Sequence, residues 1–211
     1  MTRIKICGMR TLADIDCVNQ EKPDYVGYIF VPGRRRCIQP EAAGELSAHL
    51  HADIQETGVF VDADPARICE IVSMGFLDAV QLHGQENEQD IQILRAMLDD
   101  NGYERIQIWK AFRIETADHI RRAKESSADV ILLDCGSGGS GQAFDWTLLT
   151  SEGVPTRPWF LAGGLNSQTV GGAIDMLHPW GVDVSSGVES EGAKDPEKIR
   201  LFMEQIKRRL Q

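Results

Sequence analysis

The chain has 211 residues, of which 42% are hydrophobic, and a formal net charge of -10. This length and composition suit one domain with a large buried core, and the negative charge disfavours nucleic acid or an anionic membrane as a partner. No apolar run has transmembrane length and no leader pattern opens the chain, so we expect a cytoplasmic protein. The five cysteines, an odd number without CxxC spacing, argue against a disulfide framework and a zinc site, and we expect no bound metal.

Short runs of β-branched and apolar residues recur along the chain, and each is followed by a helical pattern. The predicted strands are Arg3–Ile6, Tyr25–Phe30, Thr57–Val61, Ala79–Leu82, Ile106–Ala111, Val130–Leu133, Trp159–Ala162 and Gly181–Val184. This alternation predicts a closed parallel barrel, the (β/α)8 or TIM barrel, with residues 1–211 as its single domain. In such a barrel the chemistry lies at the carboxyl ends of the strands, so the residues that follow each run are the candidates for a site.

Helix starts are clearest at Asp64-Pro65 and Asp195-Pro196, where a capping residue precedes a proline that suits the first helical position. The first of these helices is expected to end near Gly75. The second is expected to bury one face made of Ile199, Phe202, Met203, Ile206 and Leu210. Further helices are expected after Gln39-Pro40, from Glu86 onward and after Trp146.

Two glycine-rich turns follow the last two predicted strands. Gly163 and Gly164 come after the seventh strand, and Ser186 and Gly187 come after the eighth. Glycine lets the backbone approach an anion closely, and the N–H groups at the start of the next helix favour negative charge. We therefore predict a phosphate site at these turns and a phosphorylated small molecule as the ligand. The loop after the sixth strand is expected to add N–H donors from Gly139, Ser140 and Gly141.

A thiol and a carboxylate follow two strands on roughly opposite sides of the predicted barrel. Cys7 follows the first strand, where nearby helix N-termini would favour its thiolate, so it is a candidate general base. Asp134 follows the sixth strand, where partial burial would raise its pKa and make it a candidate general acid. The alternatives are a small buried hydrophobe for Cys7 and a cap on the next turn for Asp134. Cys17 and Cys69 are expected to be core thiols on helix faces.

Charged and polar residues at other strand ends are candidates for holding the substrate. The second loop contains the basic run Arg34-Arg35-Arg36, from which one guanidinium would pair with a substrate carboxylate. His83 either contacts the substrate or ties down a neighbouring loop. Asp183, beside the phosphate turn, would be costly to bury unless it binds a group such as a substrate amine or hydroxyl. Asp62 also lies near the predicted rim.

A series of motifs resembles the phosphoribosylanthranilate isomerases of tryptophan biosynthesis, an aromatic amino acid pathway. They are Lys5-Ile6-Cys7-Gly8, Gly58-Val59-Phe60-Val61, Gln81-Leu82-His83-Gly84, Leu133-Asp134 followed by Gly138-Gly139-Ser140-Gly141 and Phe144-Asp145-Trp146, Gly163-Gly164-Leu165-Asn166, and Asp183-Val184-Ser185-Ser186-Gly187-Val188-Glu189. The motifs appear in the family's order and cover nearly the whole chain.

The resemblance implies an isomerase that needs no cofactor. Its reaction would be the Amadori rearrangement of N-(5-phosphoribosyl)anthranilate to 1-(2-carboxyphenylamino)-1-deoxyribulose 5-phosphate. By the same resemblance, Asp134 protonates the ring oxygen as general acid and Cys7 then removes the C2 proton as general base. Arg36 would hold the anthranilate carboxylate, and Asp183 would approach the amine or the sugar.

The chain departs from the family pattern in two loops. The family usually carries Ser-x-Arg before the carboxylate-binding arginine, whereas this chain reads Arg34-Arg35-Arg36-Cys37, so Arg35 is the alternative to Arg36. The loop after Asp134 is shorter than in many members and places Cys135 beside the expected acid. Because family members can be monomeric or dimeric, a monomer or a homodimer is expected.

Two other functions are compatible with a phosphate-binding barrel. A related isomerase acts on the phosphoribosyl aminoaldose of histidine biosynthesis, but that family has an aspartate where this chain has Cys7, and it shows a twofold repeat of phosphate motifs that is not found here. A noncatalytic protein that binds a phosphorylated ligand is the other alternative. The presence of both Cys7 and Asp134 argues against it, because a binding protein has no need for a matched acid and base.

Overall fold

The computed structural model describes residues 2–136 and 146–209. Within them, parallel strands form one closed barrel in the order β1 to β8, which confirms the predicted TIM barrel. The barrel strands are β1 (Arg3–Cys7), β2 (Tyr25–Ile29), β3 (Gln55–Phe60), β4 (Ala79–Leu82), β5 (Gln107–Arg113), β6 (Val130–Asp134), β7 (Trp159–Ala162) and β8 (Gly181–Val184). A short antiparallel pair, β9 (Glu189–Ser190) and β10 (Ala193–Lys194), follows β8.

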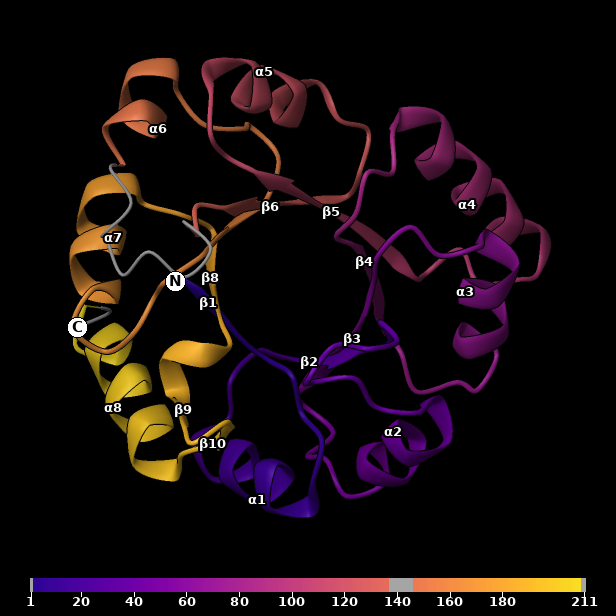
Figure 1. The fold of residues 1–211 in the computed structure, drawn as a ribbon, viewed down its shortest axis with the longest axis horizontal. Helices are drawn as coiled ribbons and strands as arrows, with labels where there is room; N and C mark the ends of the chain where they lie inside the picture. The colour runs from indigo at the N-terminus through magenta and orange to yellow at the C-terminus, as the bar shows by residue number, and fades with distance from the viewer. Residues whose placement is uncertain (1, 137–145, 210–211) are drawn as a thin grey trace.

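The helices form a ring outside the barrel (Figure 1). They are α1 (Leu12–Glu21), α2 (Pro40–Ser47), α3 (Pro65–Val72), α4 (Glu88–Asp100), α5 (Ala117–Glu125), α6 (Thr147–Glu152), α7 (Val170–Leu177) and α8 (Pro196–Lys207). A 3-10 turn, η1 (Ser186–Val188), lies between β8 and β9. In the described part of the chain, no helix combines the length and the apolar character that crossing a membrane requires.

The predicted helix starts are confirmed by their caps. The Asp64 side chain accepts a hydrogen bond from Ala66 N at 2.8 Å, and the Asp195 side chain accepts one from Glu197 N at 3.0 Å. Helix α3 ends at Val72, before the predicted stop at Gly75. The buried face of α8 contains Ile199, Phe202, Met203 and Ile206, as predicted, whereas Leu210 lies outside the described residues.

Several strand ends differ from their predicted positions by one or two residues, because ladder hydrogen bonds rather than apolar runs set the ends. Strand β5 continues to Arg113 because that residue pairs with Asp134 on β6. Strand β6 therefore includes Asp134 instead of ending at Leu133. This pairing attaches Asp134 to the barrel wall.

Side chains alternate along each strand between the barrel interior and the layer under the helices. Tyr25, Trp109 and Phe160 pack together inside the barrel, with the Trp109 ring centroid 5.0 Å from Tyr25 and 4.7 Å from Phe160. Their strand neighbours Ile108 and Leu161 belong to the larger cluster under the helices. The position of a residue in this alternation therefore tells whether its side chain enters the barrel.

Candidate active site

The same alternation directs several polar and charged side chains into the barrel. They are Lys5, Cys7, Gln81, Asp134 and Asp183, and their apolar neighbours Ile4, Ile6, Val80, Leu82, Leu133, Val182 and Val184 all belong to the cluster under the helices. Because a charged side chain is costly to bury without a partner, this interior group is the natural place to look for chemistry.

A cavity of about 260 Å³, here called the inner cavity, contains the groups predicted to act together. Its lining includes Cys7, Asp134, Gly163, Gly164, Ser186 and Gly187. The predicted substrate-binding residues Arg36, His83 and Asp183 line it as well. The remaining predicted phosphate ligands Gly139, Ser140 and Gly141 lie outside the described residues. The fold thus brings the described candidates into one site, while their individual roles stay predictions.

The two glycine turns are in direct contact. A Cβ added to Gly187 would lie 1.8 Å from the carbonyl oxygen of Leu165, so only glycine allows this approach. Gly163 has a φ of +93° and Gly164 a φ of +67°, which is the left-handed region that favours glycine. The expected helix N-termini do not follow at once. Gly187 lies in the short turn η1, and α7 begins only at Val170.

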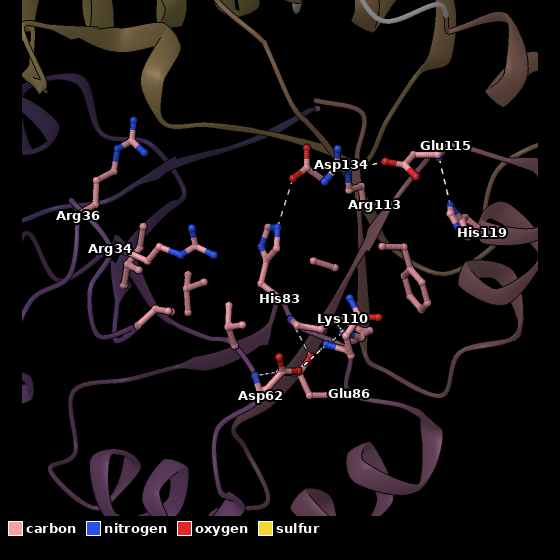
Figure 2. A pocket seen from close by; sticks show the side chains of 18 of the residues that line it. Arg34, Arg36, Asp62, His83, Glu86, Lys110, Arg113, Glu115, His119 and Asp134 are labelled. Carbon is pink, nitrogen blue, oxygen red and sulfur yellow. Dashed lines mark hydrogen bonds and ion pairs between the residues drawn. The ribbon is translucent and has the colours of Figure 1, made fainter. Parts of the chain in front are cut away.

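Asp134 is paired with His83, which follows β4 (Figure 2). His83 Nε2 lies 3.3 Å from Asp134 Oδ2, and Gly136 N donates to Asp134 Oδ1 at 3.0 Å. Burial raises the pKa of Asp134, but these hydrogen bonds and the charge of Arg113 hold the pKa below its ordinary value. The expected rise in this pKa is therefore wrong, because burial here comes with donors that favour the carboxylate. Gln81 Nε2 in turn lies 2.8 Å from His83 Nδ1.

Cys7 is 6% exposed and lies in the wall of the inner cavity. Burial raises the pKa of the Cys7 thiol above its usual value, and the ammonium groups of Lys5 and Lys194 counteract only part of this rise. The expectation that helix N-termini favour the thiolate is therefore wrong for this structure. The positive charges that act on Cys7 come from the side chains of Lys5, Lys194 and Arg36 instead.

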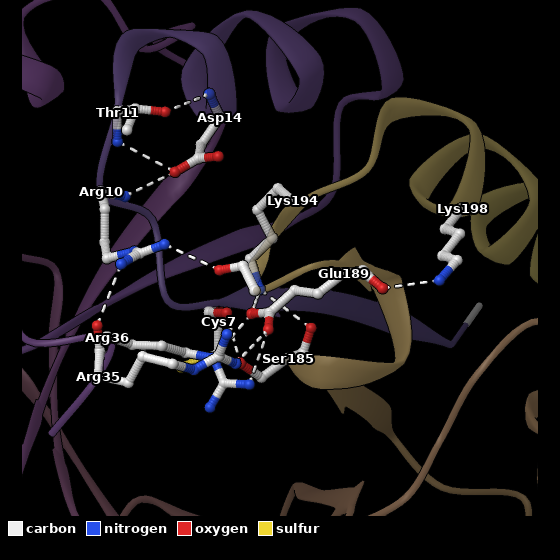
Figure 3. Close-up of polar contacts among 11 residues, drawn as sticks. Cys7, Arg10, Thr11, Asp14, Arg35, Arg36, Ser185, Glu189, Lys194 and Lys198 are labelled. Atoms are coloured by element: carbon white, nitrogen blue, oxygen red, sulfur yellow. Dashed lines mark hydrogen bonds and ion pairs between the residues drawn. The ribbon is translucent and has the colours of Figure 1, made fainter.

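Arg36 is held by Glu189, the first residue of β9 (Figure 3). Arg36 Nε and Nη2 donate to the two carboxylate oxygens of Glu189 at 2.7 and 2.8 Å, and Lys194 Nζ donates at 2.9 Å. Burial raises the pKa of Glu189, but Arg36, Lys194 and Arg35 together lower it to about 2. The Arg36 side chain is 23% exposed and that of Arg35 is 53% exposed. Arg36, and not Arg35, lines the inner cavity.

Asp183 already has a partner in the protein, which the sequence analysis missed. Lys5 Nζ donates to Asp183 Oδ1 at 3.1 Å, and both side chains are buried. The expectation that only a ligand would satisfy Asp183 is thus incomplete, although Asp183 still lines the inner cavity. A signal was available, since Lys5 stands between two apolar residues that face the helices. The sequence likewise predicted no partner for Glu189, the last residue of the motif at the end of β8.

An outer cavity of about 990 Å³ adjoins the inner cavity, and Arg36, His83 and Asp134 line both. Lys110 Nζ donates to Glu86 Oε2 at 2.7 Å on its wall (Figure 2). The Asp62 carboxylate accepts a hydrogen bond from Gln85 N at 2.6 Å. Asp62, expected near the rim, therefore joins the loops after β3 and β4.

The arrangement can hold an anion and exchange protons beside it. Residues of the two glycine turns line the inner cavity, together with a thiol and a carboxylate. An arginine stands where the inner and outer cavities meet. Across residues 2–136 and 146–209, no group of His, Cys, Asp and Glu side chains is arranged to hold a metal ion.

Sequence comparison relates the chain to one family over nearly its full length. The family described as N-(5'phosphoribosyl)anthranilate (PRA) isomerase matches residues 4–205. A protein of Acetivibrio thermocellus named N-(5'-phosphoribosyl)anthranilate isomerase is 41% identical, over 98% of this chain and 96% of that relative. A protein of the same name from Clostridium acetobutylicum is 37% identical over 99% of each chain.

Solved structures show the same likeness in three dimensions. The crystal structure of phosphoribosyl anthranilate isomerase from Thermotoga maritima superposes with a TM-score of 0.87 at 37% identity, over 98% of this chain and 99% of that chain. A phosphoribosyl anthranilate isomerase in complex with reduced 1-(o-carboxyphenylamino)-1-deoxyribulose 5-phosphate gives 0.82 at 36% identity with the same coverage. A 3-hexulose-6-phosphate synthase from Salmonella typhimurium, at 18% identity and a TM-score of 0.74, shares the fold alone.

Proposed function

The chain belongs to the N-(5'-phosphoribosyl)anthranilate isomerase family, and we propose that Cys7 and Asp134 are the base and the acid of its reaction. The chain is an aldose-ketose isomerase of tryptophan biosynthesis that converts N-(5-phosphoribosyl)anthranilate to 1-(2-carboxyphenylamino)-1-deoxyribulose 5-phosphate. The family match favours this substrate over the aminoaldose of histidine biosynthesis. The observation that carries the proposal is that both residues face one small cavity beside two touching glycine turns.

The proposed roles account for each proton in the rearrangement. Asp134 in its acid form gives a proton to the ribose ring oxygen, the bond from C1 to that oxygen breaks, and the nitrogen lone pair forms a Schiff base with C1. The Cys7 thiolate then removes the proton from C2, and the electrons of that bond form the enolamine. Transfer of the enol proton to C1 gives the ketone, and a proton exchanged through solvent from the Cys7 thiol to the Asp134 carboxylate restores the acid and the base. Substrate and product are isomers, so the proposal includes no cofactor.

The substrate phosphate is proposed to bind at the glycine turns. N–H groups of Gly163, Gly164, Ser186 and Gly187 would donate to its oxygens, since these residues line the inner cavity and the two turns touch there. Gly139, Ser140 and Gly141 are proposed to complete this site from the loop after Asp134. A phosphorylated ligand is supported by the related isomerase whose crystal structure holds a ribulose 5-phosphate derivative.

Arg36 is proposed to hold the anthranilate carboxylate. A guanidinium carries five N–H donors, and Glu189 accepts from only two of its nitrogens, Nε and Nη2. The other donors remain for a carboxylate that enters from the outer cavity, which Arg36 also lines. His83 and Asp183 are proposed to contact the rest of the substrate from the walls of the inner cavity.

The wider organisation is proposed as well. Residues 1–211 would form a single catalytic domain, because the family match and the barrel both run nearly end to end. A related Thermotoga maritima enzyme is described as dimeric and as yielding monomers, which supports a monomer or a homodimer here. Light scattering during size-exclusion chromatography would distinguish the two. A cytoplasmic location, without nucleic acid or membrane partners, completes the proposal.

The first experiment follows the loss of phosphoribosylanthranilate fluorescence, with the substrate generated in place from anthranilate and phosphoribosyl pyrophosphate. Wild type should consume it rapidly, and Cys7→Ser should lose about 10²- to 10⁴-fold in kcat while still binding product. Cys37→Ser, a change of the same atoms outside the inner cavity, is the matched control and should keep its activity. Normal turnover by Cys7→Ser would contradict the proposed base.

A further inference from the structure

Lys5 is a buried lysine inside the barrel that takes no part in the proton transfers proposed above. It is 0% exposed, and its position in the alternation of β1 places its side chain inside. Strand β1 pairs Lys5 directly with Asp183 on β8, and the two side chains form an ion pair of 3.1 Å. The ammonium is therefore held at a defined place in the barrel wall.

The ammonium of Lys5 lies beside the thiol of Cys7. The two residues are two positions apart on one strand, so their side chains point the same way. Cys7 pairs with Gly27 on β2, and a Cβ added to Gly27 would lie 2.8 Å from Cys7 Sγ and 3.2 Å from Lys5 Nζ. Cys7 Sγ and Lys5 Nζ therefore both lie next to the position that a Cβ of residue 27 would occupy, which glycine leaves empty.

Charged groups from several elements act on Cys7. Lys5 on β1 and Lys194 on β10 favour the thiolate, and Asp183 on β8 opposes it. Arg36, from the loop after β2, adds another positive charge. Burial disfavours the thiolate, and among the opposing influences that of Lys5 is the largest.

We propose that Lys5 is a positioning residue for the isomerisation, whose buried ammonium, held by Asp183, stabilises the thiolate of Cys7 when Cys7 acts as the base. This inference rests on the role proposed above for Cys7. A purely structural role explains Lys5 poorly, because a buried ion pair adds little stability compared with apolar residues of similar volume. An ammonium fixed beside Cys7 would instead stabilise the negative charge that the thiolate must carry when it acts as the base.

The test measures the titration of Cys7 itself. The rate of iodoacetamide alkylation, read on the Cys7 peptide by mass spectrometry, is followed against pH in folded wild type and variants. Lys5→Met should raise the midpoint by about one pH unit, which is an about 10-fold loss of reactivity at neutral pH. Asp183→Asn, which removes a negative charge, should lower the midpoint. Lys110→Met, which removes a second buried and ion-paired lysine on β5, should leave it unchanged.

Removing Lys5 alone leaves the Asp183 carboxylate without its partner, so Lys5→Met with Asp183→Asn is a second variant that removes both charges. Its midpoint should still lie above that of wild type, because Lys5 acts on Cys7 more strongly than Asp183 does. In Lys5→Met, kcat/KM should fall at neutral pH and recover as the pH rises. An unchanged midpoint in both folded variants would overturn the role of Lys5, whereas full turnover by Cys7→Ser would overturn the role of Cys7 on which it rests.

Discussion

The two walls of the inner cavity hold their reactive groups in opposite ways. On the wall formed by β1 and β8, the ammonium groups of Lys5 and Lys194 favour the thiolate of Cys7, yet burial keeps its pKa above the usual value. On the wall that runs from β4 to β6, Asp134 is partly exposed, and His83 and the Gly136 N–H keep its pKa below the usual value. The side chains around the cavity therefore favour a thiol on one wall and a carboxylate on the other.

These resting forms are the reverse of those that the proposed reaction needs. Catalysis requires the acid form of Asp134 and the thiolate of Cys7, so the reactive form is a minor state in which one proton has moved from the thiol to the carboxylate. The side chains around each group decide how rare that state is. Variants that change one wall at a time can separate the two contributions.

The largest expected effect comes from removing the acid. Asp134→Asn should lower kcat by about 10²- to 10⁴-fold because an amide cannot protonate the ring oxygen at neutral pH. Product binding, followed by fluorescence titration, should persist. Asp62→Asn is the matched control, since Asp62 joins two loops at the rim of the outer cavity, and its kcat should stay within a few-fold of wild type. Equal losses in both variants would contradict the assignment.

A smaller effect distinguishes the two arginines beside Glu189. Arg36→Lys should raise KM by about 10-fold, since an ammonium cannot make a forked pair with both Glu189 and a substrate carboxylate. Arg35→Lys should change KM less than about 3-fold, because Arg35 is more exposed and does not line the inner cavity. Steady-state kinetics on both variants measures the two KM values. A larger rise in KM for Arg35→Lys than for Arg36→Lys would mean that Arg35 holds the substrate carboxylate.

The pH dependence of kcat/KM tests how the groups around Asp134 act on its pKa, and it predicts the direction of the change. His83→Asn removes a donor that lowers the pKa of Asp134, so this pKa should rise toward its ordinary value of 3.8. The acid limb of kcat/KM against pH should then move to higher pH by up to about one unit. His119→Asn, at the edge of the outer cavity and bonded to Glu115 N, should leave the limb in place. A limb that His83→Asn does not move would show that another group governs it.

The smallest expected effect is on the stability of the fold at acid pH, through the ion pairs of Glu189. The pKa of Glu189 is about 2 in the folded chain and ordinarily 4.5, so its ion pairs stabilise the fold fully above pH 4.5 and are lost as the pH falls toward 2. The urea midpoint should therefore fall more steeply over this range in wild type than in Glu189→Gln. Parallel curves for the two proteins would mean that this cluster contributes nothing to acid stability.

Local patterns were enough to predict the barrel and several of the residues that line the inner cavity. The apolar runs, the Asp-Pro helix starts and the glycine turns depend on residues near one another in the chain, so each could be recognised where it stands. Cys7, Asp134 and Gly187 were found in this way, because the ends of barrel strands meet at one face whatever the rest of the sequence is. The strand ends were less certain, as the pairing of Arg113 with Asp134 shows.

The sequence by itself determined the architecture, the glycine turns and the identity of the acid and base candidates. Only the tertiary structure decided which charges meet, since Lys5 pairs with Asp183 178 residues away and Arg36 with Glu189 153 residues away. It also decided the direction of each pKa shift, where both expectations for Cys7 and Asp134 were wrong. The physical reason is that a proton affinity reflects burial and every neighbouring charge and donor, and these are set when distant segments pack together.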